Sequence, residues 1–122
     1  MTAINLKIKL LNDFPAPKYA TEDSNGLDLL ANIKEPITLK KYQRVLVPVG
    51  IKIALPKGFA AFVTPRSGLA LKHGISVTNS PGLIDTDYRG EISVILENLN
   101  DLSFIIEPGM RVAQLVVLEL PK

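Results

Sequence analysis

The sequence predicts an all-β fold, a barrel or sandwich of many short strands, with one short helix. Proline and glycine recur along the whole chain, nine and eight times in 122 residues. Between them lie short runs rich in valine, isoleucine and leucine, and this spacing is typical of strands joined by tight turns. No internal repeat or linker interrupts the pattern, so we expect a single domain over residues 1–122.

The expected strands fall into two kinds. Residues 4–10 and 92–96 alternate apolar and polar side chains, which is typical of a strand with one buried face. Residues 45–53, 104–106 and 112–120 are apolar on both faces. A strand of that second kind is buried on both sides, which suits sheet packing combined with a subunit interface.

One segment departs from the strand pattern and predicts the helix, over about residues 67–73. Ser67 is the expected N-cap, Lys72 and His73 fall in the last turn, and Gly74 is the expected C′ residue. The only histidine of the chain is therefore interpreted as structural, because a cation at a helix end lies beside free carbonyl groups.

The composition excludes several kinds of site. The chain has no cysteine and one histidine, so disulfide scaffolds, thiol enzymes, iron–sulfur clusters and multi-histidine metal sites are excluded. A net charge of +2 and 6% aromatic residues argue against nucleic-acid binding. No apolar run reaches transmembrane length and no signal peptide is visible, so we expect a cytoplasmic protein without membrane contact. The apolar fraction of 47% favours an oligomer.

The expected helix start is the first candidate site. Arg66, Ser67 and Gly68 place a guanidinium, a hydroxyl and an unhindered backbone N–H at the positive end of a helix, which is a way to hold a phosphate. A plain capped helix with a surface arginine has the same sequence, and taken alone these residues fit that interpretation better.

Residues 79–92 form the second candidate site. This segment is rich in polar residues, with a Pro-Gly pair near its start and Gly90 near its end. Asp85 and Asp87 lie on the same side if the segment is extended, and one of them can act as a base on water. The alternative is an ordinary hairpin tip, although the density of polar residues favours a site.

Two polar residues within apolar strands complete the candidates. Asp28 lies among leucines, and a buried carboxylate needs a partner, for which Arg111 is a candidate. Gln114 is an amide in an otherwise apolar strand. It is either a satisfied core group or a ligand contact, and the sequence favours neither.

Taken together, these segments resemble the trimeric dUTP pyrophosphatase (dUTPase) family. Residues 25–31 (NGLDLLA) resemble its first motif and residues 65–70 (PRSGLA) its second. Residues 82–91 (GLIDTDYRGE) resemble the third, and residues 109–115 (GMRVAQL) the fourth. The four motifs occur in the family's order and spacing over nearly the whole chain.

The resemblance implies a jelly-roll-like β subunit that assembles as a homotrimer with active sites at the subunit interfaces. It implies hydrolysis of dUTP to dUMP and pyrophosphate with Mg²⁺, which keeps uracil out of DNA and supplies dUMP for thymidylate synthesis. The implied ligand is the nucleotide alone, without nucleic acid. Such chemistry needs positioning and charge neutralisation rather than a thiol or a histidine.

The resemblance also implies roles for single residues in the chemistry. Asp85 would orient and deprotonate the water that attacks the α-phosphorus. Arg66, Ser67 and Gly68 would hold the phosphates, joined by Gln114. No residue would bind Mg²⁺ directly, because the phosphates and water would hold it. Asp28, paired with Arg111, would act on the ion through ordered water, as would Gln114.

Recognition of the nucleoside is implied for the third motif and the residues before it. Asn79 and the backbone of Gly82, Leu83 and Ile84 would bind uracil, as a short hairpin that leaves no room for the thymine methyl group. Tyr88 would lie against the deoxyribose and exclude a 2′-hydroxyl.

The family's fifth motif, a glycine-rich C-terminal arm, has no counterpart up to Lys122. Either such an arm follows Lys122 without fixed structure, which we expect, or the protein lacks it. Without an arm we expect dUTP binding with much weakened turnover, since lids of this kind exclude water.

Three other interpretations are open. The related dCTP deaminases carry a catalytic glutamate five residues after the motif's closing glycine, where this chain has Ile95, with Glu97 two residues too late. An inactive trimeric nucleotide-binding or regulatory member of the same fold is the second alternative. An unrelated β-sandwich adaptor is the third, and the four ordered motifs argue against it.

Overall fold

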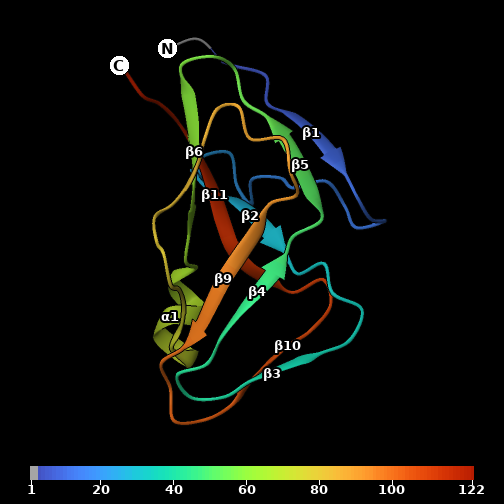
Figure 1. Ribbon diagram of the computed structural model, residues 1–122, viewed down its shortest axis with the longest axis vertical. Helices are drawn as coiled ribbons and strands as arrows, with labels where there is room; N and C mark the ends of the chain where they lie inside the picture. The colour runs from blue at the N-terminus through green and yellow to red at the C-terminus, as the bar shows by residue number, and fades with distance from the viewer. Residues whose placement is uncertain (1–2) are drawn as a thin grey trace.

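Eleven short strands and one helix form along residues 3–122, which the computed structural model describes (Figure 1). In chain order the elements are β1 Lys7–Leu10, β2 Leu27–Leu30, β3 Ile37–Leu39, β4 Arg44–Pro48, β5 Ile51–Ala54, β6 Phe59–Thr64, α1 Ser67–His73, β7 Ile75–Val77, β8 Gly82–Ile84, β9 Ser93–Asn98, β10 Phe104–Ile106 and β11 Arg111–Glu119. The prediction of an all-β fold with one short helix is confirmed.

The strands form two larger sheets and two ribbons. One sheet has the order β2-β11-β6-β8 and the other β4-β9-β7. The ribbons β1-β5 and β10-β3 lie at opposite ends of the molecule (Figure 1). Leu29, Val63 and Leu115 of the first sheet share one core with Val47 and Leu96 of the second. Antiparallel strands arranged in this way give the jelly-roll-like architecture.

The alternating patterns predicted the buried faces well and the strand lengths less well. Ile92, Val94 and Leu96 are all buried, as their alternation predicts. Strand β1 is shorter than residues 4–10, and Ile4 and Leu10 are 40% and 41% exposed. Within residues 3–122, β1 pairs with β5 alone, in a two-stranded ribbon at one end of the molecule.

The expectation of one doubly buried strand over residues 45–53 is wrong. Strand β4 ends at Pro48 and β5 begins at Ile51. Gly50, between them, has a φ of 71°, a conformation that few other residues adopt. Strand β4 then pairs with β9, whereas β5 pairs with β1. The sequence pattern missed this change of sheet because both halves are apolar.

The helix occupies the residues that the sequence predicts, but its N-cap differs. Arg66, not Ser67, is the N-cap, with extended φ and ψ of −88° and 127°, and no side chain caps the helix. Ser67 therefore lies within the first turn. Gly74 ends the helix as predicted, with a φ of 66° and its N–H donating to Ala70 O at 3.1 Å. The His73 ring packs against Phe104 at 5.2 Å between centroids, consistent with a structural role.

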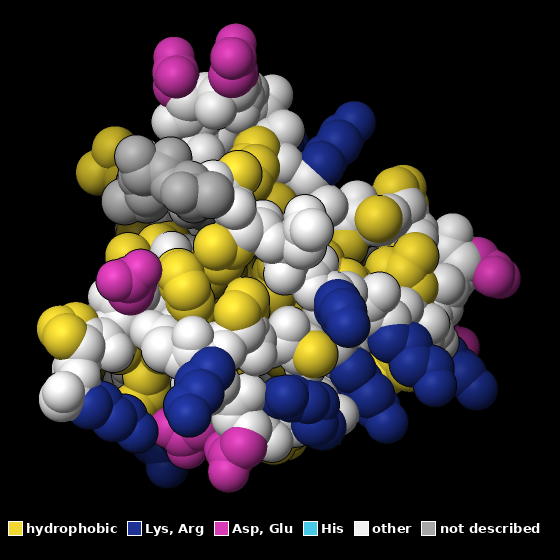
Figure 2. Space-filling model, turned by 90° about the horizontal axis from the view of Figure 1, so that it is seen from above, with side chains coloured by type: hydrophobic (Ala, Val, Ile, Leu, Met, Phe, Trp, Pro, Cys, Tyr) yellow, Lys and Arg dark blue, Asp and Glu magenta, His cyan; other side chains and the backbone are white. Residues whose placement is uncertain are grey.

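The surface carries many exposed apolar side chains. Seen from above the view of Figure 1, hydrophobic groups lie open beside a band of lysine and arginine, with acidic groups at several places around them (Figure 2). Elsewhere Leu46 on β4, Leu83 on β8 and Ile105 on β10 are 63%, 56% and 51% exposed. Single exposed apolar side chains are normal on a protein surface, whereas large contiguous patches of them mark contact surfaces. Within residues 3–122 no helix is long and apolar enough to cross a membrane.

Candidate active site

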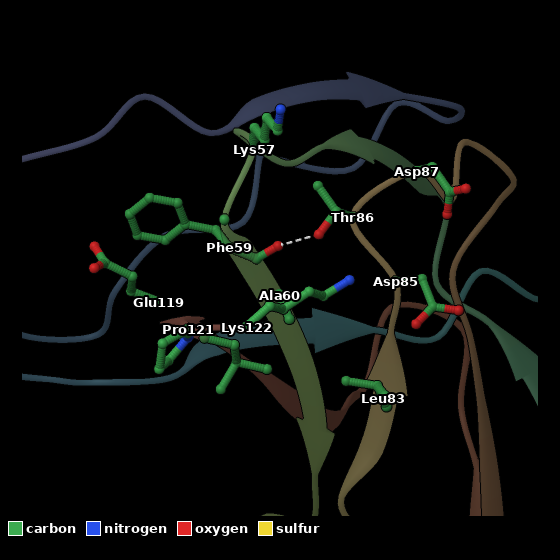
Figure 3. A pocket seen from close by; sticks show the side chains of 12 residues that line it. Lys57, Phe59, Ala60, Leu83, Asp85, Thr86, Asp87, Glu119, Pro121 and Lys122 are labelled. Carbon is green, nitrogen blue, oxygen red and sulfur yellow. Dashed lines mark hydrogen bonds between the residues drawn. The ribbon is translucent and has the colours of Figure 1, made fainter.

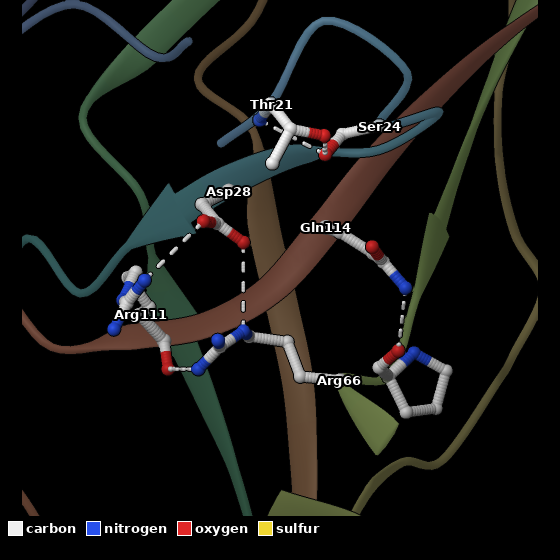
Figure 4. A network of polar contacts seen from close by, with 7 residues as sticks. Thr21, Ser24, Asp28, Arg66, Arg111 and Gln114 are labelled. Carbon is white, nitrogen blue, oxygen red and sulfur yellow. Dashed lines mark hydrogen bonds and ion pairs between the residues drawn. The ribbon is translucent and has the colours of Figure 1, made fainter. Parts of the chain in front are cut away.

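Four polar side chains gather where β2, β11 and the end of β6 lie side by side. They are Asp28, Arg66, Arg111 and Gln114, called here the Asp28 cluster (Figure 4). Antiparallel pairing places Asp28 opposite Gln114, and Gln114 opposite Thr64, two residues before Arg66. Residues far apart in the chain thus meet because β11 pairs with both β2 and β6.

The carboxylate at the centre of the cluster is shared by two guanidinium groups. Arg66 Nε lies 3.4 Å from Asp28 Oδ1, and Arg111 Nη1 lies 3.8 Å from Asp28 Oδ2. Arg66 also donates from Nη1 to the carbonyl of Arg111 at 3.4 Å. The predicted partner Arg111 is therefore present, and Arg66 is a second, closer one. The Asp28 side chain is only 22% exposed, and its contacts orient the Arg66 guanidinium toward β2.

Gln114 is a satisfied polar group that also borders a cavity. Its Nε2 donates to the carbonyl of Pro65 at 3.0 Å, so the amide is tied to the chain just before the helix. Its Oε1 lies only 2.3 Å from where a Cβ on Gly26 would be, so any side chain at Gly26 would displace it. The same side chain lines a cavity, which leaves it within reach of a ligand.

That cavity lies beside the helix start and has a volume of about 290 Å³. Ser67 and Gly68 line it from the first turn of α1, together with the Asp28 cluster. A Cβ on Gly68 would meet nothing within 4 Å, so the fold itself does not require glycine there. Two guanidinium groups, a free helix start and an unhindered backbone suit an anionic ligand that approaches closely.

The second candidate region is the Asp85 turn, defined as residues 85–91. The expectation of an extended segment is wrong, because the chain turns at Thr86 and Asp87 and Tyr88 N–H donates to Asp85 O at 3.1 Å. The hydroxyl of Thr86 donates to Phe59 O and ties the turn to β6 (Figure 3). The carboxylates of Asp85 and Asp87 line the same large cavity of about 950 Å³.

Two more side chains of the turn bind its own backbone. Arg89 Nη1 donates to Thr86 O at 2.7 Å and to Tyr88 O at 3.1 Å. The Tyr88 hydroxyl donates to Glu91 O at 2.8 Å. Asp85 itself is exposed, and with Tyr88 and Leu83 it lines a further cavity of about 370 Å³. The carboxylate is therefore open to water and to a ligand.

The residues expected to recognise the base lie just before this turn. Asn79 is exposed, and its Nδ2 is 3.2 Å from where a Cβ on the buried Gly82 would lie. Leu83 is exposed on β8 and Ile84 is half-buried. The two strands that flank Asn79, β7 and β8, do not pair with each other as in a regular β-hairpin. Strand β7 pairs with β9, whereas β8 pairs with β6.

One chain does not bring the two regions together. Strands β2 and β8 are opposite edges of the four-stranded sheet, so they lie about 14 Å apart at the usual strand spacing. Ile84 pairs with Ala61, three residues before Thr64, which adds about 10 Å along the strands. The cavity of the Asp28 cluster and the two cavities at Asp85 share no residue.

The fold and the two regions define a class of protein, a jelly-roll-like β subunit with a cationic cavity at one sheet edge and an exposed carboxylate turn at the other. The chain belongs to the dUTPase family, whose sequence profile matches residues 12–122.

Curated relatives carry the same assignment. A Rickettsia felis protein named deoxyuridine 5′-triphosphate nucleotidohydrolase is 56% identical over 119 residues, which are 96% of this chain and 80% of that protein. A Chlamydia felis protein of the same name is 63% identical over 101 residues, covering 83% of this chain and 69% of that protein.

Solved structures support the fold. A dUTPase from phage phi11 of S. aureus, described with a structural Mg(II) ion, superposes with a TM-score of 0.87 at 18% identity, covering 98% of this chain and 93% of that one. A Staphylococcus bacteriophage 80alpha dUTPase with dUpNHpp gives a TM-score of 0.86 at 21% identity, with the same coverage.

Sequence reasoning missed residues that hold the site rather than form it. Thr86 and Arg89 were read as parts of a motif, and Glu91 as its end. Their roles depend on which carbonyl groups lie nearby in space, and for Thr86 that carbonyl belongs to a distant strand. The Arg66–Asp28 contact was missed for the same reason, although two arginines near one isolated carboxylate are a usable signal.

Proposed function

We propose that this protein hydrolyses dUTP to dUMP and pyrophosphate, as a single domain over residues 1–122. The observation that carries the proposal is a preformed cationic cavity and a separate exposed carboxylate on a chain of the dUTPase family. The names of relatives at 56% and 63% identity support the same reaction.

In this proposal the Asp28 cluster binds the triphosphate. Arg66 is held by Asp28, so its remaining guanidinium N–H groups face an anion at little entropic cost. Ser67 supplies a hydroxyl that caps no helix, and Gly68 lets the backbone N–H groups approach the phosphate oxygens. Gln114 supports the start of the helix through Pro65 and joins the phosphate contacts.

The donor groups beside this cavity fit a Mg²⁺ ion that is held chiefly by substrate. Mg²⁺ prefers oxygen ligands and keeps several waters. Asp28 and Gln114 offer a carboxylate and an amide oxygen to those waters, while the phosphates offer direct ligands. In the described part of the chain no group of three or more His, Cys, Asp or Glu gathers around a common point. When bound, the ion neutralises charge on the triphosphate.

Asp85 is proposed as the general base. Its exposed carboxylate accepts a proton from the water that attacks the α-phosphorus, and pyrophosphate leaves. Asn79 and the backbone of residues 82–84 bind uracil, and Tyr88 packs against the deoxyribose. The Tyr88 hydroxyl is already bonded to Glu91 O, which supports a fixed ring that leaves no space for a 2′-hydroxyl.

A homotrimer with shared sites is part of the proposal. A general base must lie within about 3 Å of the proton that it takes, or act through one water. The separation between β2 and β8 within one chain supports an arrangement in which Asp85 of one copy faces the Asp28 cluster of another. Exposed Leu46 and Leu83, near Asp85, support a covered surface there. A cytoplasmic location is part of the proposal, and a nucleotide substrate is compatible with it.

Substrate choice is the first test. Pyrophosphate release is measured with dUTP, dTTP, dCTP and UTP in the presence of Mg²⁺, using protein of known intact mass. We expect turnover of dUTP alone. Equal turnover of dTTP, or ammonia release from dCTP, contradicts the proposal, and the second result indicates a deaminase instead. Binding of dUTP without turnover indicates a binding or regulatory member of the family.

Mixing two impaired variants, assayed at a low dUTP concentration, tests whether sites are shared. Asp85→Asn and Arg66→Ala are unfolded together and refolded as a mixture, and each variant is refolded alone as the control. In randomly mixed trimers about one site in four receives both an intact Asp85 and an intact Arg66 from different chains. We therefore expect about a quarter of wild-type activity in the mixture. Failure to recover activity, or a stable monomer in sedimentation, contradicts shared sites.

A further inference from the structure

Glu91 lies where three sheets of the molecule meet. It precedes β9, and its carboxylate reaches Gly50, between β4 and β5, and Asn32, just after β2. Asn32 in turn accepts a hydrogen bond from Asn12, just after β1, at 3.1 Å. One half-buried acidic side chain therefore connects segments that belong to different sheets.

A single oxygen of this carboxylate makes both direct contacts. Glu91 Oε2 accepts from the backbone N–H of the buried Gly50 at 2.9 Å and from Asn32 Nδ2 at 3.2 Å. A carboxylate that accepts a backbone and an amide N–H in a half-buried position makes strong, well-directed bonds. This arrangement fixes the Glu91 side chain against the body of the protein.

The backbone of the same residue holds the tyrosine of the Asp85 turn. The Glu91 carbonyl accepts the Tyr88 hydroxyl at 2.8 Å, and Tyr88 N–H donates to Asp85 O. Ile92, on the other side, is fixed by backbone bonds to Val49 and Ile51. Gly90 precedes Glu91 and has wide conformational freedom. The Glu91 carbonyl is therefore held from two sides, through the planar peptide group that it shares with the Ile92 N–H and through the anchored Glu91 side chain.

We propose that Glu91 is a positioning residue that fixes Tyr88 and thereby sets the discrimination between deoxyribonucleotide and ribonucleotide substrates. The inference rests on the proposed function, in which Tyr88 excludes a 2′-hydroxyl. Glu91 contacts no reacting group in this account. It acts through its carbonyl, which the anchored side chain helps to hold in addition to the Ile92 backbone bond, and the carbonyl in turn fixes the Tyr88 ring.

A double-mutant cycle tests this route. The ratio of kcat/KM for dUTP to kcat/KM for UTP is measured in wild type, Glu91→Ala, Tyr88→Phe and the double variant. We expect each single variant to lower the ratio about tenfold and the double variant to lower it no further, because both changes break the same link. Additive losses, or an unchanged ratio in Glu91→Ala, overturn the proposal.

Two further variants separate positioning from general destabilisation. Glu91→Gln keeps an oxygen able to accept both N–H groups, and we expect a ratio within about twofold of wild type. Ile106→Val, in the buried core of β10, lowers the melting temperature without touching this network, and the ratio stays unchanged. If Ile106→Val lowers the ratio as much as Glu91→Ala at equal loss of stability, the effect is not specific and the proposal fails.

Hydrogen exchange distinguishes this proposal from the function on which it rests. Glu91→Ala is expected to raise amide exchange over residues 85–91 while exchange in β11 stays unchanged. If wild-type protein turns over dUTP but these results are absent, only the positioning role fails. If wild-type protein does not turn over dUTP, the proposed function fails, and the role of Glu91 in substrate discrimination fails with it. Raised exchange in Glu91→Ala would then still support the structural link between Glu91 and the Asp85 turn.

Discussion

The Asp28 cluster and the Asp85 turn are built in opposite ways. In the cluster, ion pairs between side chains join segments of different strands, as in the contacts of Asp28 with Arg66 and Arg111, and two further bonds go to backbone carbonyls. In the turn, the side chains of Thr86, Tyr88 and Arg89 bind backbone carbonyls. The cluster fixes a charge pattern on a rigid sheet. The turn fixes the shape of a loop and leaves its acid, Asp85, exposed.

This difference predicts different responses to substitution. A change in the turn is expected to alter the rate of the chemical step with little effect on folding, because Asp85 lies in the open. A change in the cluster is expected to alter binding and stability together, because the same charges hold the strands and the ligand. The predictions below are ordered from the largest expected effect to the smallest.

Asp85→Asn is expected to lower kcat for dUTP at least about a thousandfold, since the amide cannot accept the proton of the attacking water. Binding of dUpNHpp, measured by calorimetry, stays within a few-fold of wild type. Asp87→Asn is the matched control, because it removes a neighbouring carboxylate of the same cavity. If Asp87→Asn loses the activity and Asp85→Asn keeps it, the assignment of the base is wrong.

Arg66→Ala is expected to lower kcat/KM about a hundredfold, chiefly through weaker binding of the triphosphate. Lys72→Ala removes an exposed cation from the same helix and serves as the control. It is expected to leave kcat/KM unchanged. Equal losses in both variants would mean that overall charge, not the oriented guanidinium, attracts the nucleotide.

Gly68→Ala is expected to separate stability from activity. Alanine favours a helix over glycine by about 0.5–1 kcal/mol, and a Cβ at this position meets no other atom of the chain. The variant should therefore unfold at a slightly higher urea concentration while kcat/KM falls about tenfold, because the methyl group obstructs the phosphate. Unchanged activity would show that the backbone at Gly68 does not approach the ligand.

Asp28→Asn is expected to cost at most about 1 kcal/mol of unfolding free energy, because its ion pairs are partly exposed. Urea titration in low and high salt measures the cost, which should shrink in high salt. Asp101→Asn provides the comparison, because that side chain lies 2.6 Å from Lys41 but is 84% exposed. It should cost less despite the shorter distance, and a larger cost there contradicts the role of burial.

The sequence predicted those features that depend on the residues of a single strand or helix. The alternation of residues 92–96 reports one buried face, and the start and end residues of the helix report its length. Residues 45–53 show the limit of such reasoning, since both halves are apolar and only Gly50 marks the change of sheet. Ser67 shows another, because a serine within the first turn and a serine at the N-cap leave the same sequence signal.

The candidate site was predictable as a set of residues but not as an arrangement. Arg66 and Asp85 are close in sequence and belong to adjacent motifs, which suggests one pocket. The sheet order β2-β11-β6-β8 places their regions apart, and sheet order depends on long-range pairing that short motifs do not encode. Of the two partners of Asp28, the sequence predicted Arg111, which lies on the neighbouring strand. It did not predict Arg66, which follows the end of β6.

The backbone acceptors of the Asp85 turn also bear on how this chain tolerates change over generations. Thr86, Tyr88 and Arg89 bond to the carbonyls of Phe59, Glu91, Thr86 and Tyr88. Every amino acid brings a carbonyl, so no substitution at an accepting position deletes the acceptor. Direct loss of a hydrogen-bonding group is therefore confined to the few donors, although a substitution such as Glu91→Ala can still shift an acceptor. Position 59 can therefore accept different side chains, within the limits of packing, while its carbonyl still binds Thr86 and the turn keeps its shape.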